Sequence, residues 1–188
     1  SIALTPDGRS LVTTSADGEL TWWDLDSREK TRTLEIAPGY RALALSPSNL
    51  ASIEGKAMSF LGEGDLNGAR EVLRTASANV GPTELVAFVA AYEDLVWVLD
   101  EKQRELLVRL TPSAFDDDRG TWALCLTQAY ALKGDEANMR RFAEEARSAY
   151  EEQLRDAPDN AQQQALLGLS LAYLGRKEDA IREGTRGV

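Results

Sequence analysis

Short turns built on glycine recur between amphipathic helical segments over most of this 188-residue chain, and they constrain its fold more than any other feature. Gly64-Asp65, Gly134-Asp135 and Gly175 each separate two stretches in which apolar residues recur at helical spacing. The pattern predicts pairs of antiparallel helices that stack side by side. A stacked pair cannot bury its apolar face alone and so presents a surface, which favours binding over catalysis.

The helical region from residue 49 to 188 resembles tetratricopeptide repeats, helix-turn-helix units of about 34 residues with small residues where their two helices cross. The residues at matching positions are Ala57, Phe60, Gly64, Asp65, Ala69, Leu73 and Ala76, then Leu126, Ala129, Tyr130, Gly134, Asp135 and Ala146, then Leu167, Gly168, Gly175, Ala180 and Ile181. The resemblance implies a mainly α fold, a tetratricopeptide-type α-α superhelix. Its units would be 49–82, a degenerate 83–118, 119–158 and a truncated 159–188.

The third unit is longer than the repeat requires, because Gly134 and Gly175 lie 41 residues apart. The excess of about seven residues is two helical turns, which keeps an apolar stripe on the same face. We therefore expect a lengthened second helix that ends at Asp156-Ala157-Pro158-Asp159, after which Asp159 or Asn160 caps the next helix.

The degenerate unit is expected to hold two helices. Pro82-Thr83 opens a buried helix that runs through about Leu99, and Asp100 caps a second helix from Glu101 to Leu110. The apolar stretch from Leu85 to Leu99 contains two acidic residues and is shorter than the roughly 20 residues that cross a bilayer, so we expect no membrane insertion.

The first 48 residues follow a strand pattern. Two similar pieces, 2–8 and 43–49, lie 41 residues apart, and Asp17-Gly18 marks a tight turn between strands, so the order predicts a small antiparallel β-meander. The stretch 15–24, which ends in Trp22-Trp23-Asp24, resembles the end of a WD-repeat blade. The resemblance implies a propeller-blade remnant at 1–48, in which both tryptophans pack. Gly39-Tyr40 replaces the Gly-His pair of that family, so its histidine-centred hydrogen-bond network is not expected.

Composition excludes several classes of function. The formal net charge of −10 repels a nucleic-acid backbone, and the chain has no histidine, the commonest general base and metal ligand. Cys125, the single cysteine, lies in an apolar run and is expected to be a buried thiol. We expect no catalysis, no cofactor and no metal. The acidic balance and the lone thiol favour the cytoplasm.

Three motifs admit a chemical reading beside a plainer one. Asp116-Asp117-Asp118 offers carboxylates to a cation, but residues just before a helix are more often caps. Gly62-Glu63-Gly64 lacks the third glycine and the strand of a nucleotide loop, and is interpreted as an interhelical turn. Acidic pairs such as Glu144-Glu145 are interpreted as solvated helix faces, although a hydrolase that uses carboxylates is a rival hypothesis.

The inner face of the repeats is the candidate protein-binding site. Repeat geometry places there Thr121, Leu124, Gln128, Leu132, Gln162, Leu169 and Tyr173. This lining is apolar with a few amides and lacks the Lys, Arg and Asn that clamp a terminal carboxylate in similar repeats. It suits an extended or helical apolar peptide, or the protein's own propeller. The alternative is that these residues only pack against further repeats.

Three stretches, 49–56, 112–123 and 174–184, make residues 48–188 resemble the carboxy-terminal helical-repeat region of large bacterial proteins associated with serine/threonine kinases. The chain begins within a strand pattern and stops within a helix pattern, which we interpret as a piece of a longer protein. The resemblance implies a non-catalytic interaction segment of a bacterial signalling protein. The alternative is the regulatory carboxy-terminal region of a kinase whose catalytic domain lies outside this chain.

Overall fold

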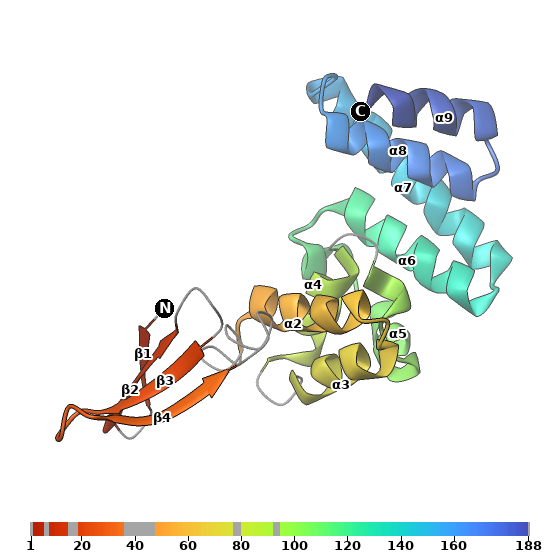
Figure 1. Ribbon diagram of the computed structural model, residues 1–188. Coiled ribbons are helices and arrows are strands. Elements are labelled where there is room, and N and C mark those ends of the chain that lie inside the picture. The colour runs from red at the N-terminus through yellow and green to blue at the C-terminus, as the bar shows by residue number, and fades with distance from the viewer. Residues whose placement is uncertain are drawn as a thin grey trace. The chain divides into compact units, whose positions relative to one another are not determined.

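The computed structural model describes residues 2–5, 8–14, 19–35, 48–76, 80–91 and 95–187 (Figure 1). These residues are mainly helical with one small antiparallel sheet, as the sequence predicts. The chain divides into two compact units, Ser1–Gly81 and Pro82–Val188. The predicted domain boundary at residue 48 stays a prediction.

The first unit opens with a four-stranded sheet in the order β1-β2-β3-β4. Each strand pairs antiparallel with the next, in a register that sets Val12 opposite Trp22 and Trp22 opposite Arg32. The strands are β1 Ile2–Leu4, β2 Ser10–Thr14, β3 Glu19–Asp24 and β4 Lys30–Glu35. The predicted meander is therefore confirmed, whereas the Asp17-Gly18 turn, the Gly39-Tyr40 pair and most of the second similar piece lie outside the described residues.

Both tryptophans of the sheet make contacts within it, as the packing interpretation predicts. The indole Nε1 of Trp23 donates to Thr13 Oγ1 at 2.9 Å, and the Arg32 guanidinium lies 5.1 Å from the centre of the Trp22 ring. Asp24 ends β3 and accepts hydrogen bonds from the backbone of Ser27, which lowers the pKa of its carboxyl group. Each of these contacts joins neighbouring strands or residues of one turn, so they stabilise the sheet.

A helical hairpin completes the first unit, with α2 Leu50–Gly62 and α3 Leu66–Ala76. Asn49 caps α2 through its side chain, and Gly64 turns the chain with a φ of +78°, a conformation that glycine adopts without strain. A Cβ on Gly68 would lie 2.5 Å from the Phe60 ring, so the helices meet at this glycine. The predicted interhelical turn at Gly62-Glu63-Gly64 is confirmed.

The second unit begins with short elements: α4 Pro82–Ala91, η1 Leu95–Trp97, α5 Glu101–Leu107 and η2 Pro112–Phe115. The prediction of one helix through Leu99 is wrong, because α4 ends at Ala91 and η1 is a separate 3₁₀ turn. Asp100 caps α5 in a capping box with Gln103, and its extended backbone cannot continue a helix from Leu99.

The end predicted for that second helix, Leu110, is also wrong. The backbone N–H of Arg109 bonds to Leu106 and that of Leu110 bonds to Leu107, so the chain tightens into a turn after Leu107.

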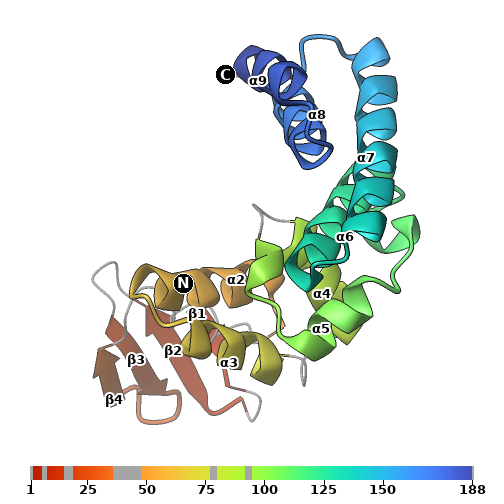
Figure 2. The same ribbon diagram turned by 90° about the vertical axis from the view of Figure 1, so that its right-hand side faces the viewer.

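Four longer helices form the rest of the unit: α6 Arg119–Lys133, α7 Glu136–Asp156, α8 Ala161–Tyr173 and α9 Lys177–Arg186 (Figure 2). Gly134 and Gly175 turn the chain between α6 and α7 and between α8 and α9, with φ of +71° and +77°. The lengthened second helix is confirmed, since α7 spans 21 residues. The three predicted glycine turns, including Gly64, are therefore all present.

Aspartate and asparagine caps begin three of these helices, as the sequence predicts for two. Asp118 accepts from the N–H groups of Gly120 and Thr121, and Asn160 accepts from that of Gln163. Asp135 caps α7 in the same way. Among the described residues no three His, Cys, Asp or Glu side chains gather in a way that could hold a metal ion, and no helix is long and apolar enough to cross a membrane.

Candidate functional site

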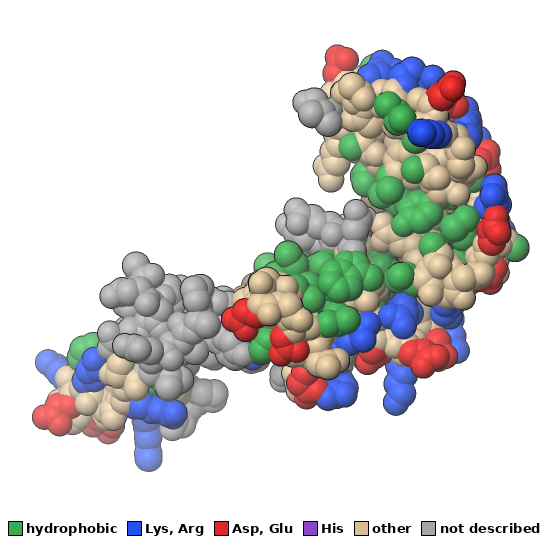
Figure 3. All heavy atoms as spheres, turned by 45° about the vertical axis from the view of Figure 1, so that its right-hand side comes forward, with side chains coloured by type: hydrophobic (Ala, Val, Ile, Leu, Met, Phe, Trp, Pro, Cys, Tyr) green, Lys and Arg blue, Asp and Glu red, His purple; other side chains and the backbone are tan. Residues whose placement is uncertain are grey.

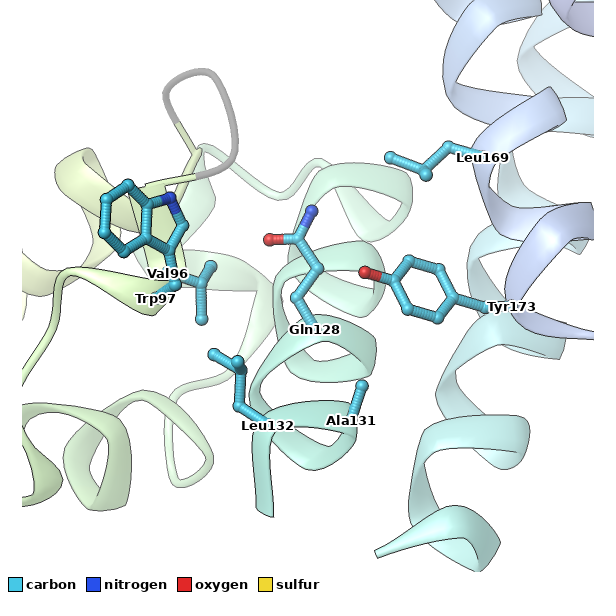
Figure 4. A pocket seen from close by; sticks show the side chains of 7 residues that line it. All are labelled: Val96, Trp97, Gln128, Ala131, Leu132, Leu169 and Tyr173. Atoms are coloured by element: carbon cyan, nitrogen blue, oxygen red, sulfur yellow. The ribbon is translucent and has the colours of Figure 1, made fainter. Parts of the chain in front are cut away.

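Two hollows in the second unit contain all the residues predicted for the binding face. The first has a volume of about 350 Å³ and lies between η1, α6 and α8. It is lined by Val96, Trp97, Gln128, Ala131, Leu132, Leu169 and Tyr173. Figure 4 shows Tyr173 of α8 and Gln128 of α6 turned toward one another across it. Val96 and Trp97 were not predicted to line this face, because their apolar spacing fits a continuous helix.

The second hollow, of about 210 Å³, continues the first. Its lining is Ala90, Ala91, Thr121, Leu124, Cys125, Gln128, Tyr150, Gln162 and Leu166. Gln128 lines both hollows and so marks the boundary between them. We call the two hollows together the α6–α8 groove. The structure brings the seven predicted residues to this groove, while their role in binding a protein stays a prediction.

The groove runs along two parallel helices. Thr121 and Gln162, near the beginnings of α6 and α8, line the second hollow, and Leu132 and Tyr173, near the ends of the same helices, line the first. Two successive hairpins place their first helices in the same direction, so α6 and α8 form its walls over most of their length. Any bound segment therefore meets the two hollows in series.

Among the residues that the structure describes, no charged side chain lines either hollow. The sequence has no Asp, Glu, Lys or Arg from Gly120 to Leu132 and none from Asn160 to Gly175, although 28% of the chain is charged. The polar groups of this described lining are hydroxyls, side-chain amides, the Cys125 thiol and the Trp97 indole N–H.

Large apolar side chains stand open to solvent in the first hollow. Trp97 is 45% exposed and Leu132 is 53% exposed, whereas Val96 and Gln128 beside them are buried. Figure 3 shows hydrophobic side chains gathered on one face of the helices in the upper right of the view, with charged side chains along their outer edge. Exposed tryptophan beside apolar pockets is typical of the anchor positions of protein interfaces.

A chain of side-chain hydrogen bonds holds the groove walls in register. Gln153 of α7 donates to the Asp118 carboxylate at 3.1 Å and accepts from Gln163 of α8 at 3.1 Å. Asp118 also accepts from the Thr121 hydroxyl at 2.7 Å. These bonds connect the start of α6, the end of α7 and the start of α8. No local sequence pattern predicts that Gln153 connects these helices, because its partners Asp118 and Gln163 lie 35 and 10 residues away along the chain.

Further contacts fix α6 against the short elements before it. The Trp122 indole N–H donates to the Leu110 carbonyl at 2.8 Å. On its other partner helix, α7, the Trp122 ring packs edge to face on Phe142, with ring centres 5.5 Å apart. The buried Cys125 thiol donates to the Ala90 carbonyl at 3.1 Å. The thiol is thus a packed side chain, as the sequence predicts.

The outer helices carry the charges that the groove lacks. The Arg147 guanidinium bonds Glu144 and Glu151 at 2.5 Å each, which lowers the pKa of Glu144 and raises that of Arg147. On α9, Arg176 and Arg182 both bond Asp179 and lower the pKa of its carboxyl group. Each pair has at least one partner that is more than 40% exposed, so each contributes little to the free energy of unfolding.

A third hollow, of about 280 Å³, lies between the end of α7, α8 and α9 and is lined by both charges. Its Arg186 bonds Glu183 at 3.2 Å, and its Glu151 bonds Arg147. The lining thus mixes two carboxylates with two guanidinium groups, so it presents no charge of one sign to a ligand.

Comparisons with known proteins assign no family. No protein-family model matches the sequence, and no curated protein is significantly similar to it. Among solved structures, the chain is similar to one described as "Crystal structure of MamA", with 18% identical residues, a TM-score of 0.40, and coverage of 79% of this chain and 82% of that one. A likeness this weak carries no argument about fold or function, which therefore depend on the groove itself.

Proposed function

We propose that this chain is a non-catalytic protein-interaction segment that binds a polypeptide in the α6–α8 groove. The observation that carries the proposal is a lining in which no described residue is charged, with Trp97 and Leu132 exposed beside it. Interface cores are depleted in charge and enriched in aromatic anchors. Thr121, Leu124, Gln162, Leu169 and Tyr173 complete the contact surface in this proposal.

The hairpins fit a tetratricopeptide-type superhelix, with units at 49–82, 83–118, 119–158 and 159–188, and the sheet fits a propeller-blade remnant. Turns at Gly64, Gly134 and Gly175 support the first part, and the four-stranded meander supports the second. We place the segment in a larger bacterial signalling protein, in the cytoplasm, on its sequence resemblance and composition. An upstream reading frame with kinase motifs would instead favour the regulatory tail of a serine/threonine kinase.

Affinity capture with matched variants tests the binding function. The purified full chain, its Leu132→Asp variant and its Ile181→Asp variant are immobilised and exposed to extract from the source organism. Ile181 is a matched control because it is 59% exposed on α9 and lines neither α6–α8 hollow. We expect stoichiometric polypeptides that the wild type and Ile181→Asp retain and Leu132→Asp loses. Equal capture by all three proteins contradicts the proposal.

A further inference from the structure

We infer that the α6–α8 groove holds its polypeptide partner in one direction, with basic residues of the partner beside the starts of α6 and α8 and apolar residues of the partner in the first hollow. This inference rests on the proposed function, because it names the partner of the same groove. Its basis is a difference between the two ends of the groove: one end has a surplus of carboxylates, and the other has exposed apolar side chains.

The starts of α6 and α8 lie together at one end of the groove. Asp118 caps α6, and Gln163 lies in the first turn of α8. The Gln153 side chain joins them, because it donates to Asp118 and accepts from Gln163 at 3.1 Å each. The stretches 116–119 and 155–160 therefore meet beside the second hollow.

This end of the groove is acidic. Besides the cap Asp118, the two stretches contain four exposed aspartates: Asp116, Asp117, Asp156 and Asp159. Their arginines, Arg119 and Arg155, do not balance these carboxylates, because Arg119 is bonded to Glu145 and lies 3.6 Å from Glu152. The negative potential of this end attracts lysine or arginine of a partner and repels acidic residues.

The other end of the groove is apolar. Trp97 and Leu132, which are 45% and 53% exposed, both line the first hollow there (Figure 4). Apolar side chains of a partner gain about 25 cal/mol for each Å² of surface that they remove from water at this hollow. Exposed side chains of both charge signs lie at or just after the ends of the two helices: Lys133, Glu136, Lys177 and Glu178.

The two ends are far enough apart to act separately on a bound segment. Thr121, which lines the second hollow, and Leu132, which lines the first, are 11 residues apart on α6, or about 16 Å along its axis. Charges in water are largely screened beyond about 8 Å at physiological salt. A segment bound in the reverse direction would thus place its basic residues out of reach of the aspartates, so the groove favours one direction.

A displayed library of random 12-residue peptides, selected on the immobilised full chain, tests this inference. We expect a consensus with Lys or Arg toward one end and apolar residues toward the other. The best peptide should bind the double variant Asp117→Asn/Asp159→Asn about fivefold more weakly at low salt, and the difference should disappear in 1 M salt. Asparagine tolerates the positive φ of 61° at residue 117, so this variant keeps the backbone.

Glu63→Gln/Glu105→Gln is the matched control. It makes the same change of charge at two exposed residues that line neither hollow of the groove. The peptide should bind this control as it binds the wild type. Equal affinity for the two double variants at low salt overturns the inference, as does a consensus without basic residues.

Photo-crosslinking to the wild-type chain determines the direction without any variant. The peptide carries benzophenone at its basic end or at its apolar end, and mass spectrometry identifies the crosslinked residues. We expect the basic end to reach 116–119 or 155–163 and the apolar end to reach 95–97 or 131–133. The reverse pattern overturns the inference and leaves the proposed function intact, whereas a library that yields no peptide sensitive to Leu132→Asp overturns the proposed function as well.

Discussion

Helices α6 and α8 differ from helices α7 and α9 in charge, although each hairpin of the second unit contains one of each kind. From Gly120 to Leu132 and from Asn160 to Gly175 the sequence has no charged residue, whereas α7 and α9 carry interlaced Arg and Glu or Asp side chains. Both kinds of helix bury one face in the shared core, at residues such as Ala123 and Ala146. Their second faces differ, because one borders the groove and the other meets water.

The difference shows that charged and apolar residues have separate roles in this unit. Exposed pairs contribute about 0–1 kcal/mol each, so the charges of α7 and α9 mainly keep an outer face soluble. The uncharged faces of α6 and α8 extend beyond the residues buried in the core, since Leu132 of α6 is half exposed. Leu132 lines the first hollow together with the exposed Trp97, and this grouping of apolar side chains is the basis of the proposed interface.

The largest effect on the free energy of unfolding is expected where the uncharged helix α8 packs against the charged helix α9. A Cβ on Gly168 of α8 would lie 2.8 Å from the backbone nitrogen of Gly184 and 2.9 Å from the carbonyl oxygen of Ala180, both on α9. Gly168→Ala should therefore lower the free energy of unfolding by about 1–3 kcal/mol, measured by urea denaturation.

Gly184→Ala is the matched control on the facing helix. A Cβ at Gly184 meets nothing within 4 Å, so alanine should raise the free energy of unfolding by about 0.5–1 kcal/mol through helix propensity. If Gly168→Ala were as stable as the control, α8 and α9 would not pack at this distance.

The next largest effect on stability concerns the hydrogen bonds of Asp118, which join the start of α6 to α7. Asp118→Ala removes the cap of α6 and the acceptor of Gln153, and should lower the free energy of unfolding by about 1–2 kcal/mol. Asp118→Asn keeps an acceptor oxygen and should recover most of that loss in the same urea measurement. Equal losses in the two variants would show that negative charge, rather than the hydrogen bonds, stabilises the start of α6.

Local signals in the sequence predict the turns and caps of this protein well. Glycine at Gly64, Gly134 and Gly175 is needed for a positive φ, and Asn160 precedes an apolar periodic run, so each marks a boundary without reference to the rest of the chain. The lengthened α7 follows from the same reasoning, because two extra turns preserve its buried stripe.

The region from 95 to 110 is where the sequence-based prediction fails. Its apolar residues fit a buried helix by periodicity, yet Leu95 to Trp97 forms a 3₁₀ turn that buries Leu95 and Val96 and exposes Trp97. Tertiary packing decides which of these residues are buried, and the sequence of neighbouring residues carries no information about that packing. The seven groove residues could be predicted because they repeat along helices, whereas Trp97 and the link through Gln153 depend on contacts distant in sequence.

Exchanging charge between the two faces should separate stability from binding. Arg147→Met on α7 removes two ion pairs and keeps the aliphatic contacts, so the free energy of unfolding should fall by about 0.5–1 kcal/mol while peptide affinity is unchanged. Leu132→Lys on α6 should change that free energy by less than about 0.5 kcal/mol and abolish peptide binding. A loss of binding in Arg147→Met would refute the division between the two faces.

The smallest effect is the pH dependence that the outer charges give to stability. Arg147 lowers the pKa of Glu144 below its ordinary value of 4.5, so this carboxylate stabilises the fold above that value, and its contribution disappears as the pH falls through the lowered pKa. Glu144→Gln should therefore cost about 0.3–0.5 kcal/mol at pH 7 and nothing once the wild-type carboxyl is protonated, in urea titrations at both pH values. None of the described residues that line the groove carries a carboxyl, imidazole or amino group, so peptide affinity in high salt should stay constant between pH 5 and 8. A peptide affinity that followed the Glu144 titration would mean that the charged face of α7 reaches the binding surface.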